Sequence, residues 1–329
     1  MRIGINPQKL EKKIELTTYH RIIVVVFIPE LKGFYEKSFE VFKLCINSLI
    51  SSVHNKTAIT IVNNGSCSEV SSFLNEYLRL NKIDTLIHHS INIGKIDAMI
   101  GAARGVREKL ITLSDSDILF KGEWQKNVED VFTKFNNVGS VSPIPVRQTE
   151  YYGTSSTLKQ ILLKKIKFNR VAIPENFDDY NKYLQSINWN LEVDPLVKWP
   201  VISNNGFKAV LGSGHQVLTI DRDILFTTVP TFASLTLVGG SSEYDYVDIP
   251  IDRANKLRLS TYNNYAYHMG NTPEKWMEDI VFENKNSRST SDLFLSDIKK
   301  TRYFFNKTIS YKFYRFKSRL IKKMFKKVC

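Results

Sequence analysis

Short apolar segments alternate with amphipathic ones between residues 21 and 143, and this alternation limits the fold more than any other feature of the chain. The apolar run at 22–28, which Pro29 follows, has the length of a central strand in a parallel sheet. The pattern predicts strands at 21–28, 57–62, 85–88, 110–114 and 138–143, and helices at 39–53, 70–80, 94–107 and 124–135. Strands that alternate with helices predict an α/β fold with a mostly parallel, doubly wound (Rossmann-like) sheet flanked by helices.

Two aspartates directly follow the strand predicted at 110–114. Asp115 and Asp117 therefore lie at the carboxyl end of a strand, the edge at which open α/β sheets bind ligands. Carboxylates two positions apart can act together, one on a divalent cation and one on a ribose or a metal-bound water. Mg²⁺ and Mn²⁺ prefer such oxygen ligands. A solvated acidic turn has the same local sequence, so the motif needs support from the rest of the chain.

Composition narrows the class of protein. The chain has 329 residues, 43% of them hydrophobic, which suffices for one large α/β domain with additions or for two small domains. No apolar stretch approaches the ~20 residues of a membrane-spanning helix, and the first residues do not resemble a signal peptide. The three cysteines form no C-x-x-C pair. We therefore expect a reducing cytosol, and neither a disulfide framework nor a structural zinc site.

The net charge of +13 is concentrated in the last part of the chain. Residues 298–329 contain twelve Lys or Arg and no Asp or Glu, which leaves +1 for residues 1–297. Aromatic residues alternate with these cations, a composition typical of a segment that lies on an anionic membrane surface. RNA binding uses the same chemistry, and a helix that docks its apolar face on the body is a third reading. We favour the membrane surface, because nothing else in the chain points to nucleic acid.

Residues 145–205 interrupt the alternation of strands and helices. They are polar and carry Pro174, Pro195 and Pro200 together with several tyrosines and two tryptophans. We interpret them as an insertion over the carboxyl edge of the sheet, where specificity loops belong. The apolar pattern returns at 207–211 and 217–220, continues through a helix near 242–255, and ends at 262–269.

Six short motifs, in order along the chain, resemble those of family 2-type glycosyltransferases with the GT-A fold. They cover residues 21–145 and 205–271. The motifs are Ile28-Pro29-Glu30 after the first strand, Val62-Asn63-Asn64-Gly65-Ser66, Asn92-Ile93-Gly94-Lys95-Ile96-Asp97-Ala98, Leu113-Ser114-Asp115-Ser116-Asp117 with the D-x-D, Gly239-Gly240-Ser241-Ser242-Glu243-Tyr244-Asp245 with Asp248, Asp252 and Arg253 beyond it, and Tyr267-His268-Met269-Gly270.

The resemblance implies a division of the chain and a metal site. It implies a nucleotide-sugar-binding half at 21–145, an inserted specificity region at 146–205 and an acceptor and catalytic half at 206–297, with an extension at 1–20 and the membrane-associating tail at 298–329. Asp117 and His268 are expected to hold Mn²⁺ or Mg²⁺, with Asp115 on the ribose or a metal-bound water. A histidine at the end of a strand can also be a core residue, but H-x-G downstream of D-x-D favours ligation.

The catalytic base falls in the segment 243–253. A carboxylate there would take the proton of the acceptor hydroxyl, and the candidates are Glu243, Asp245 and Asp248. The family's E-D-x-D-L-x-x-R pattern is stretched here, and Arg253 is displaced by one residue. The identity of the base therefore stays open, and a solvated helix start would also explain Ser242 followed by acidic residues.

Donor-binding residues follow from the same resemblance. Asparagines replace the aspartate that usually faces the nucleobase, which weakens the preference for uracil while keeping UDP-sugars favoured. Lys95 could pair with a phosphate or be a solvated lysine at a helix start, and His215 lies in a glycine turn that could line the sugar pocket. The predicted donor-binding set is Pro29, Glu30, Asn63, Asn64, Lys95, Asp97, Asp115, Ser116 and His215.

The resemblance implies a metal-dependent glycosyltransferase that moves a hexosyl or N-acetylhexosaminyl group from a nucleoside-diphosphate sugar to a glycan or lipid-linked acceptor. We expect inversion, in bacterial surface polysaccharide synthesis, on the cytoplasmic face of the membrane. Three alternatives stay open: a retaining enzyme of the same fold, a sugar nucleotidyltransferase, and a non-catalytic protein that binds anionic lipid or nucleic acid. The nucleotidyltransferase ranks low, because Pro29-Glu30-Leu31-Lys32-Gly33 stands where such enzymes carry a glycine-rich phosphate loop.

Overall fold

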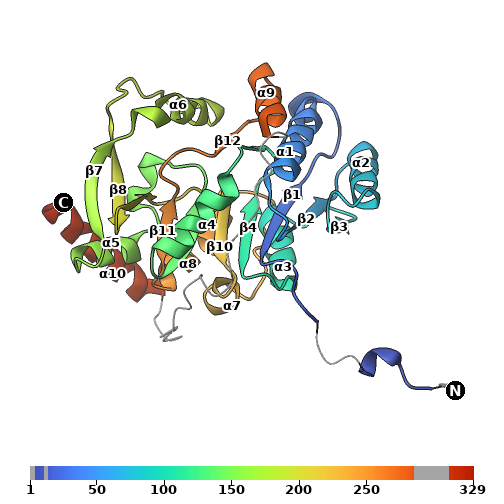
Figure 1. Cartoon of the computed structure of the whole chain (residues 1–329), viewed down its shortest axis with the longest axis horizontal. Helices are drawn as coiled ribbons and strands as arrows, with labels where there is room; N and C mark the ends of the chain where they lie inside the picture. Colours follow the sequence, from blue (N-terminus) through green and yellow to red (C-terminus); the bar gives the residue numbers. More distant parts are fainter. Residues whose placement is uncertain (1–3, 11–13, 285–310) are drawn as a thin grey trace.

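A ten-stranded sheet forms the body of the protein, of which the computed structural model describes residues 4–10, 14–284 and 311–329 (Figure 1). The strands are β1 (His20–Val26), β2 (Thr57–Asn64), β3 (Thr85–His89), β4 (Leu110–Ser114), β6 (Val138–Ser142), β7 (Lys167–Ala172), β8 (Lys198–Asn204), β9 (Phe207–Leu211), β10 (Val217–Asp221) and β11 (Leu257–Ser260). Their order is β3-β2-β1-β4-β10-β6-β11-β9-β8-β7. A second, two-stranded sheet pairs β5 (Ile118–Phe120) with β12 (Ala266–His268).

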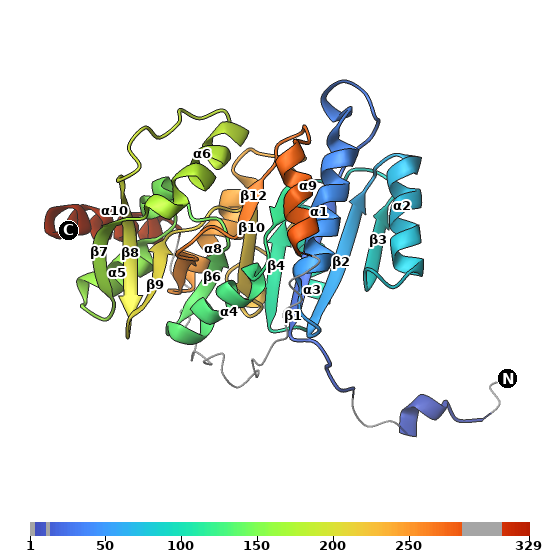
Figure 2. The ribbon, with the colours of Figure 1, turned by 45° about the horizontal axis from the view of Figure 1, so that its top comes forward.

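Helices cover both faces of the sheet. They are α1 (Ser38–Ser52), α2 (Ser68–Arg79), α3 (Lys95–Gly105), α4 (Trp124–Lys134), α5 (Ser155–Leu162), α6 (Phe177–Ser186), α7 (Ile224–Thr227), α8 (Ile249–Arg253), α9 (Lys275–Asn284) and α10 (Tyr311–Val328). Short 3-10 turns lie at Pro7–Leu10, Gly33–Tyr35, Arg147–Tyr151 and Pro174–Asn176, and a π-helical turn, η5, lies at Tyr244–Asp248. Figure 2 shows α9 beside α1, far from it in sequence.

The parallel half of the sheet contains β3, β2, β1 and β4. Alternate residues of β1 point to opposite faces, as the pleat of a strand requires. Ile22 and Val24 join the core beneath α1, α2 and α4, whereas Ile23 and Val25 join the core beneath α3 and α7. Burial on both faces explains why this segment is apolar without a break. The predicted α/β sheet is confirmed, and its predicted strands and helices up to 143 lie within two residues of those observed.

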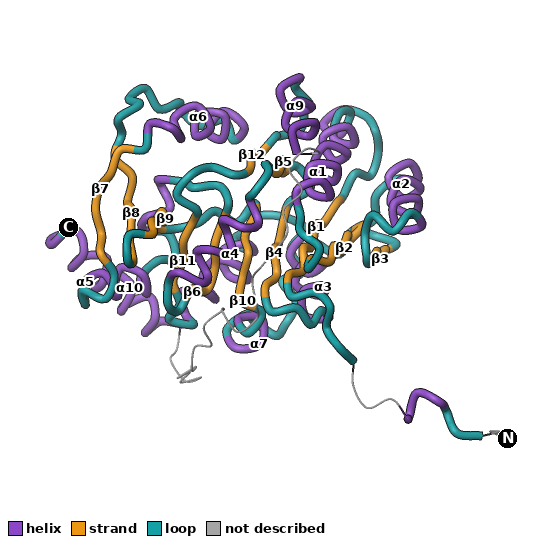
Figure 3. The backbone as a smooth tube through the Cα atoms, in the orientation of Figure 1, coloured by secondary structure: helices purple, strands orange, loops and turns teal. Residues whose placement is uncertain are grey.

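The second half of the sheet is mixed. β10 is antiparallel to both β4 and β6, β11 is parallel to β6, and β9, β8 and β7 continue as an antiparallel edge. The segment 146–205 supplies β7, β8, α5 and α6, so it widens the sheet, and Ser186 of α6 lies 2.9 Å from Nδ1 of His268. Figure 3 shows α5 and α10 together at this end of the molecule.

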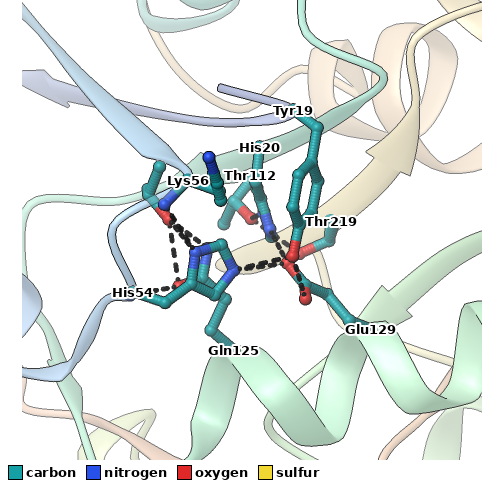
Figure 4. Close-up of polar contacts among 9 residues, drawn as sticks. Tyr19, His20, His54, Lys56, Thr112, Gln125, Glu129 and Thr219 are labelled. Carbon is teal, nitrogen blue, oxygen red and sulfur yellow. Dashed lines mark hydrogen bonds and ion pairs between the residues drawn. The ribbon is translucent and has the colours of Figure 1, made fainter. Parts of the chain in front are cut away.

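A buried polar cluster lies beneath β1, and Figure 4 shows its members. Glu129 of α4 accepts hydrogen bonds from His20 Nδ1 at 2.7 Å, from His54 Nε2 at 3.0 Å and from the Tyr19 hydroxyl at 2.8 Å. Thr112 Oγ1 lies 2.7 Å from Nε2 of His20. Within the described residues, the ligand atoms of His20, His54 and Glu129 are close enough to one another to share a metal ion. Because protein hydrogen bonds already engage these ligand atoms, we interpret the cluster as a structural network.

Candidate active site

The aspartates of the D-x-D motif lie between β4 and β5. The backbone N–H of Asp115 donates to the carbonyl of Gln216 at 2.8 Å, which fixes the start of the motif. β5 pairs antiparallel with β12 in a register that places His268 opposite Ile118. As a result, Nε2 of His268 lies 3.4 Å from Oδ2 of Asp117, although the two residues are far apart in sequence.

The donor atoms at this point fit a divalent cation. Oδ1 of Asp117 is buried and has no hydrogen-bond partner in the described part of the chain. Nδ1 of His268 lies 2.9 Å from the hydroxyl of Ser186. When Nδ1–H donates there, the lone pair of Nε2 faces Asp117, which is the usual arrangement of a metal-ligating imidazole. Burial raises the pKa of Asp117, and the nearby charge of His268 opposes that rise. A carboxylate oxygen without a partner beside a free imidazole nitrogen suits Mn²⁺ or Mg²⁺.

Lys95 joins the metal motif to the proposed catalytic segment. Its Nζ lies 2.6 Å from Oδ1 of Asp115 and 3.8 Å from Oε1 of Glu243. Burial works to lower the pKa of Lys95, but the adjacent Asp115 and Glu243 outweigh it and raise the pKa. The ammonium is therefore charged at neutral pH, and it can meet an anionic phosphate at the sheet edge.

An open cavity of about 470 Å³ adjoins these residues. Five predicted site residues line it, namely Asn64, Lys95, Asp115, Ser116 and Asp117. The other lining residues were not predicted, and they are mainly apolar or aromatic: Val25, Phe27, Phe34, Tyr35, Asn92, Leu237 and Val238. The ring centroids of Phe27 and Tyr35 lie 6.1 Å apart, and those of Phe34 and Tyr35 lie 5.2 Å apart. The sequence could have indicated this wall through the aromatic residues that follow the first strand, Phe27, Phe34 and Tyr35.

Pro29 and Glu30 were predicted to bind the donor, but they lie outside the lining of the cavity. β1 ends at Val26, and Phe27 is the residue beyond it that lines the cavity. Both Pro29 and Glu30 are exposed and do not line the cavity. The strand was predicted two residues too long, because the apolar run continues through Phe27 and Ile28 after the strand pairing stops.

The two asparagines of the β2 turn have different surroundings. Nδ2 of Asn63 donates to Ser71 at 2.9 Å, and its Oδ1 accepts the N–H of Ser66 at 3.0 Å, so this side chain holds the turn and does not line the cavity. Asn64 lines the cavity, while its amide donates to Oδ1 of Asn92 at 2.8 Å. Asn64 is therefore the better placed of the two for contact with a donor.

Asp97 does not line the cavity but holds the loop at 234–238, which forms part of the cavity wall. Its carboxylate accepts the backbone N–H groups of Ser234 and Leu235, at 2.7 and 2.9 Å. The N–H of Lys95 donates to the carbonyl of Leu237 at 2.8 Å, so α3 holds this loop at two points. Gly94 has φ 97°, and a Cβ there would lie 2.4 Å from the carbonyl oxygen of Thr236. The glycine thus permits the close approach of the loop.

The three candidate bases are not equivalent. Glu243 is partly buried and faces Lys95, whereas Asp245 is exposed. The stretched pattern in this region has a structural counterpart, because residues 244–248 form a π-helical turn that continues directly into α8. A π-turn holds one residue more than the α-helical turn it replaces, which accounts for the displacement of Arg253 by one position.

Asp248 is part of a buried ion-pair network. Its Oδ1 lies 2.6 Å from a terminal nitrogen of Arg258, and both side chains are fully buried. Its Oδ2 lies 3.1 Å from Nδ1 of His215. Burial lowers the pKa of His215, but Asp248 outweighs it and raises the pKa. Asp248 therefore supports the site, and His215 lies close enough to Lys95 and Asp115 to sense their charges.

Comparison with known proteins gives a family match for part of the chain. Residues 34–186 match the model of the family described as "Glycosyl transferase family 2". This segment belongs to glycosyl transferase family 2. The family resemblance is thereby confirmed for this segment, which contains Asp115 and Asp117. No curated protein matches the chain.

Several solved glycosyltransferase structures are similar to the chain. TarS of S. aureus is 12% identical, with 80% of this chain covered and a TM-score of 0.45. The mannosyltransferase PcManGT of Pyrobaculum calidifontis, solved with GDP-Man and Mn²⁺, is 12% identical, with 82% covered and a TM-score of 0.45. GalNAc-T7, solved with UDP, GalNAc and Mn²⁺, is 14% identical, with 77% covered and a TM-score of 0.47. The chain spans 38%, 63% and 43% of their respective lengths. These TM-scores lie below 0.5, so the fold of this chain rests on its own strand order.

Proposed function

We propose that this chain is a metal-dependent, inverting glycosyltransferase that moves a hexosyl or N-acetylhexosaminyl group from a nucleoside-diphosphate sugar to an acceptor hydroxyl. The approach of His268 Nε2 to Asp117 Oδ2, at 3.4 Å beside the cavity, is the observation that carries the proposal. The family 2 match supports it, because the matched segment contains Asp117 and most of the residues that line the cavity.

The proposal assigns roles to the metal motif, to Lys95 and to the aromatic residues that line the cavity. Mn²⁺ or Mg²⁺ held by Asp117 and His268, with Asp115 on the ribose or a metal-bound water, would supply positive charge against the diphosphate of the donor. Lys95, whose ammonium lies 2.6 Å from Asp115, adds a second positive charge for the phosphates. Phe27, Phe34 and Tyr35 offer apolar ring surfaces to the nucleobase. Among the donors we favour a UDP-sugar.

We assign the base to Glu243. Asp248 is fully buried against Arg258 and Asp245 is exposed, whereas Glu243 lies 3.8 Å from Lys95, which lines the cavity. The carboxylate of Glu243 takes the proton of the acceptor hydroxyl as the oxygen bonds to the anomeric carbon. The bond from that carbon to the diphosphate breaks at the same time, and the electron pair leaves with the diphosphate. A single displacement of this kind inverts the anomeric configuration.

For the acceptor, we propose a glycan or lipid-linked hydroxyl in bacterial surface polysaccharide synthesis, on the cytoplasmic face of the membrane. The concentration of the chain's positive charge in residues 298–329 supports this setting, since it suits an anionic lipid surface. Residues 285–310, which include the start of that segment, lie outside the described part of the chain.

Donor hydrolysis and calorimetric binding test the proposal. A panel of UDP- and GDP-sugars would be assayed with and without Mn²⁺, using Asp117→Asn and His268→Gln. We expect both substitutions to reduce turnover at least about a hundredfold, since each removes a metal ligand. Asp178→Asn, at an exposed position of α6, is the matched control and should leave turnover unchanged.

Glu243→Gln separates chemistry from binding. If Glu243 is the base, this variant should bind the donor with Mn²⁺ as the parent does, yet lose transfer to the acceptor. Turnover that needs no metal, or that survives Asp117→Asn, would contradict the proposed function.

A further inference from the structure

Helix α10 has one apolar stripe that packs against the body of the protein. Tyr314, Ile321 and Phe325 are buried, and they recur at the spacing of one helical face. The ring of Phe325 lies 5.2 Å from that of Phe168 and 6.2 Å from that of Tyr151. The hydroxyl of Tyr314 donates to Oδ2 of Asp252 at 2.5 Å. These contacts fix the helix beside α5, at the β7 end of the sheet (Figure 1).

A second apolar stripe on α10 faces away from the body. Phe316, Leu320 and Met324 are 66%, 50% and 48% exposed. Their spacing of four residues places them on one side of the helix, one turn above another. Docking of the first stripe therefore leaves the second uncovered by the described residues. A soluble surface helix ordinarily carries polar residues at such positions.

The charge on this helix is entirely positive. Its eighteen residues contain eight Lys or Arg and no Asp or Glu. Six of these cations are exposed, namely Lys312, Arg315, Arg319, Lys323, Lys326 and Lys327. None of the eight makes an ion pair with any described residue. The exposed apolar stripe is thus bordered by cations that are available to an anionic partner.

We infer that α10 lies in the headgroup region of an anionic lipid bilayer, with Phe316, Leu320 and Met324 inserted between the lipids and the flanking cations on the headgroups. Helices with this combination of an apolar stripe and basic flanks bind in the interface plane. Each Lys or Arg near an anionic surface adds to the attraction between the helix and the lipid headgroups. Within the described residues, no helix is long and apolar enough to cross a bilayer.

Other partners fit this face less well. A second copy of the chain would place two helices of eight positive charges each against one another, which is repulsive. Single-stranded RNA would satisfy the cations and could stack on Phe316, but Leu320 and Met324 offer it no flat ring. Aliphatic side chains between cations suit acyl chains beneath anionic headgroups.

The inference extends the proposed function by naming the membrane surface as the partner of α10. It is tested with the full chain by sedimentation with vesicles of equal parts phosphatidylcholine and phosphatidylglycerol. The test variant carries Phe316→Ser, Leu320→Ser and Met324→Ser, which are exposed and should not disturb folding. The matched control carries Leu78→Ser, Leu163→Ser and Phe282→Ser, which are exposed apolar positions outside α10.

We expect the parent and the control to bind these vesicles equally, and the test variant to bind about a hundredfold more weakly because three side chains no longer leave water. Phosphatidylcholine vesicles alone, or high salt, should reduce binding of the parent strongly. Equal binding by the test variant and the control would overturn the inference, as would equal binding to neutral and anionic vesicles.

Two further readouts keep the outcomes distinct. A single-stranded RNA oligonucleotide that bound the parent while the anionic vesicles did not would also overturn the inference, in favour of RNA. Donor hydrolysis is measured on the same preparations and should be equal in parent, test variant and control. Absence of hydrolysis in all three proteins would count against the proposed function. Absence of vesicle binding by the parent, with hydrolysis retained, would overturn only the inference about α10.

Discussion

Replacing Glu129 by Gln should remove the charge that holds the buried cluster of Figure 4 together. Burial opposes ionisation of this carboxyl, but hydrogen bonds from His20 and His54 outweigh it and lower its pKa from 4.5 to about 2. At 1.36 kcal/mol per pKa unit, this difference corresponds to about 3 kcal/mol of folding free energy at neutral pH. The new side-chain amide would also present an N–H₂ group where three donors now converge. We therefore expect E129Q to lose about 3 kcal/mol of stability at pH 7.

The effect should depend on pH with a definite sign. A carboxyl whose pKa falls on folding stabilises fully above its unfolded value of about 4.5, and this stabilisation is lost as the pH falls towards 2. Burial lowers the pKa of His20, so protonation of the unfolded state adds to the loss of stability below about pH 6.5. The difference between the parent and E129Q should therefore be constant from pH 7 to about pH 5 and shrink at lower pH.

Urea unfolding, followed by tryptophan fluorescence, measures both quantities. Trp124 is a suitable probe, because its ring lies 6.0 Å from that of His20. Glu76→Gln, at an exposed position of α2, is the control and should change stability little at any pH. A loss below about 1 kcal/mol for E129Q at pH 7, or a loss that persists unchanged at pH 3, would refute this reasoning.

Three further substitutions test the loop beside the cavity and the docking of α10. Asp97→Ala removes the acceptor of two loop N–H groups and should raise the KM for the donor about tenfold with a smaller change in kcat, as steady-state kinetics would measure. Gly94→Ala forces a Cβ against Thr236 in a left-handed conformation and should cost about 1–3 kcal/mol in urea unfolding. Tyr314→Phe leaves a buried oxygen of Asp252 without that donor and should cost about 1–3 kcal/mol, measured in the same way.

Much of the parallel half of the fold could be predicted because its strands are buried on both faces. Continuous apolar runs such as 22–28 are the direct consequence of that burial, and the helices between them show one apolar face. The antiparallel additions were harder to predict. β7 is an edge strand whose residues are all exposed or half-buried, and its sequence, Lys167–Ala172, shows no apolar run. Its pairing with β8 depends on tertiary contacts that the local sequence does not specify.

The approach of Asp117 to His268 was predictable because their residue types are chemically restricted. Asp115, Asp117 and His268 stand out because few residues can hold a hard cation, and the pairing of β5 with β12 brings two of them together. The aromatic wall was missed, because an aromatic residue after a strand has the same sequence pattern whether it lines a cavity or the core. The tail offered three interpretations: a membrane surface, RNA, and a helix docked on the body. One apolar stripe of α10 is docked on the body, and binding to a membrane stays a proposal.

Pulsed electron paramagnetic resonance of Mn²⁺ bound with UDP tests the central claim most directly. Coordination by His268 predicts an imidazole nitrogen coupling to Mn²⁺ that disappears in His268→Gln. The coupling should persist in His215→Gln, whose imidazole is engaged by Asp248. A Mn²⁺–UDP complex without nitrogen coupling, or one whose coupling is lost in His215→Gln and retained in His268→Gln, would contradict the account.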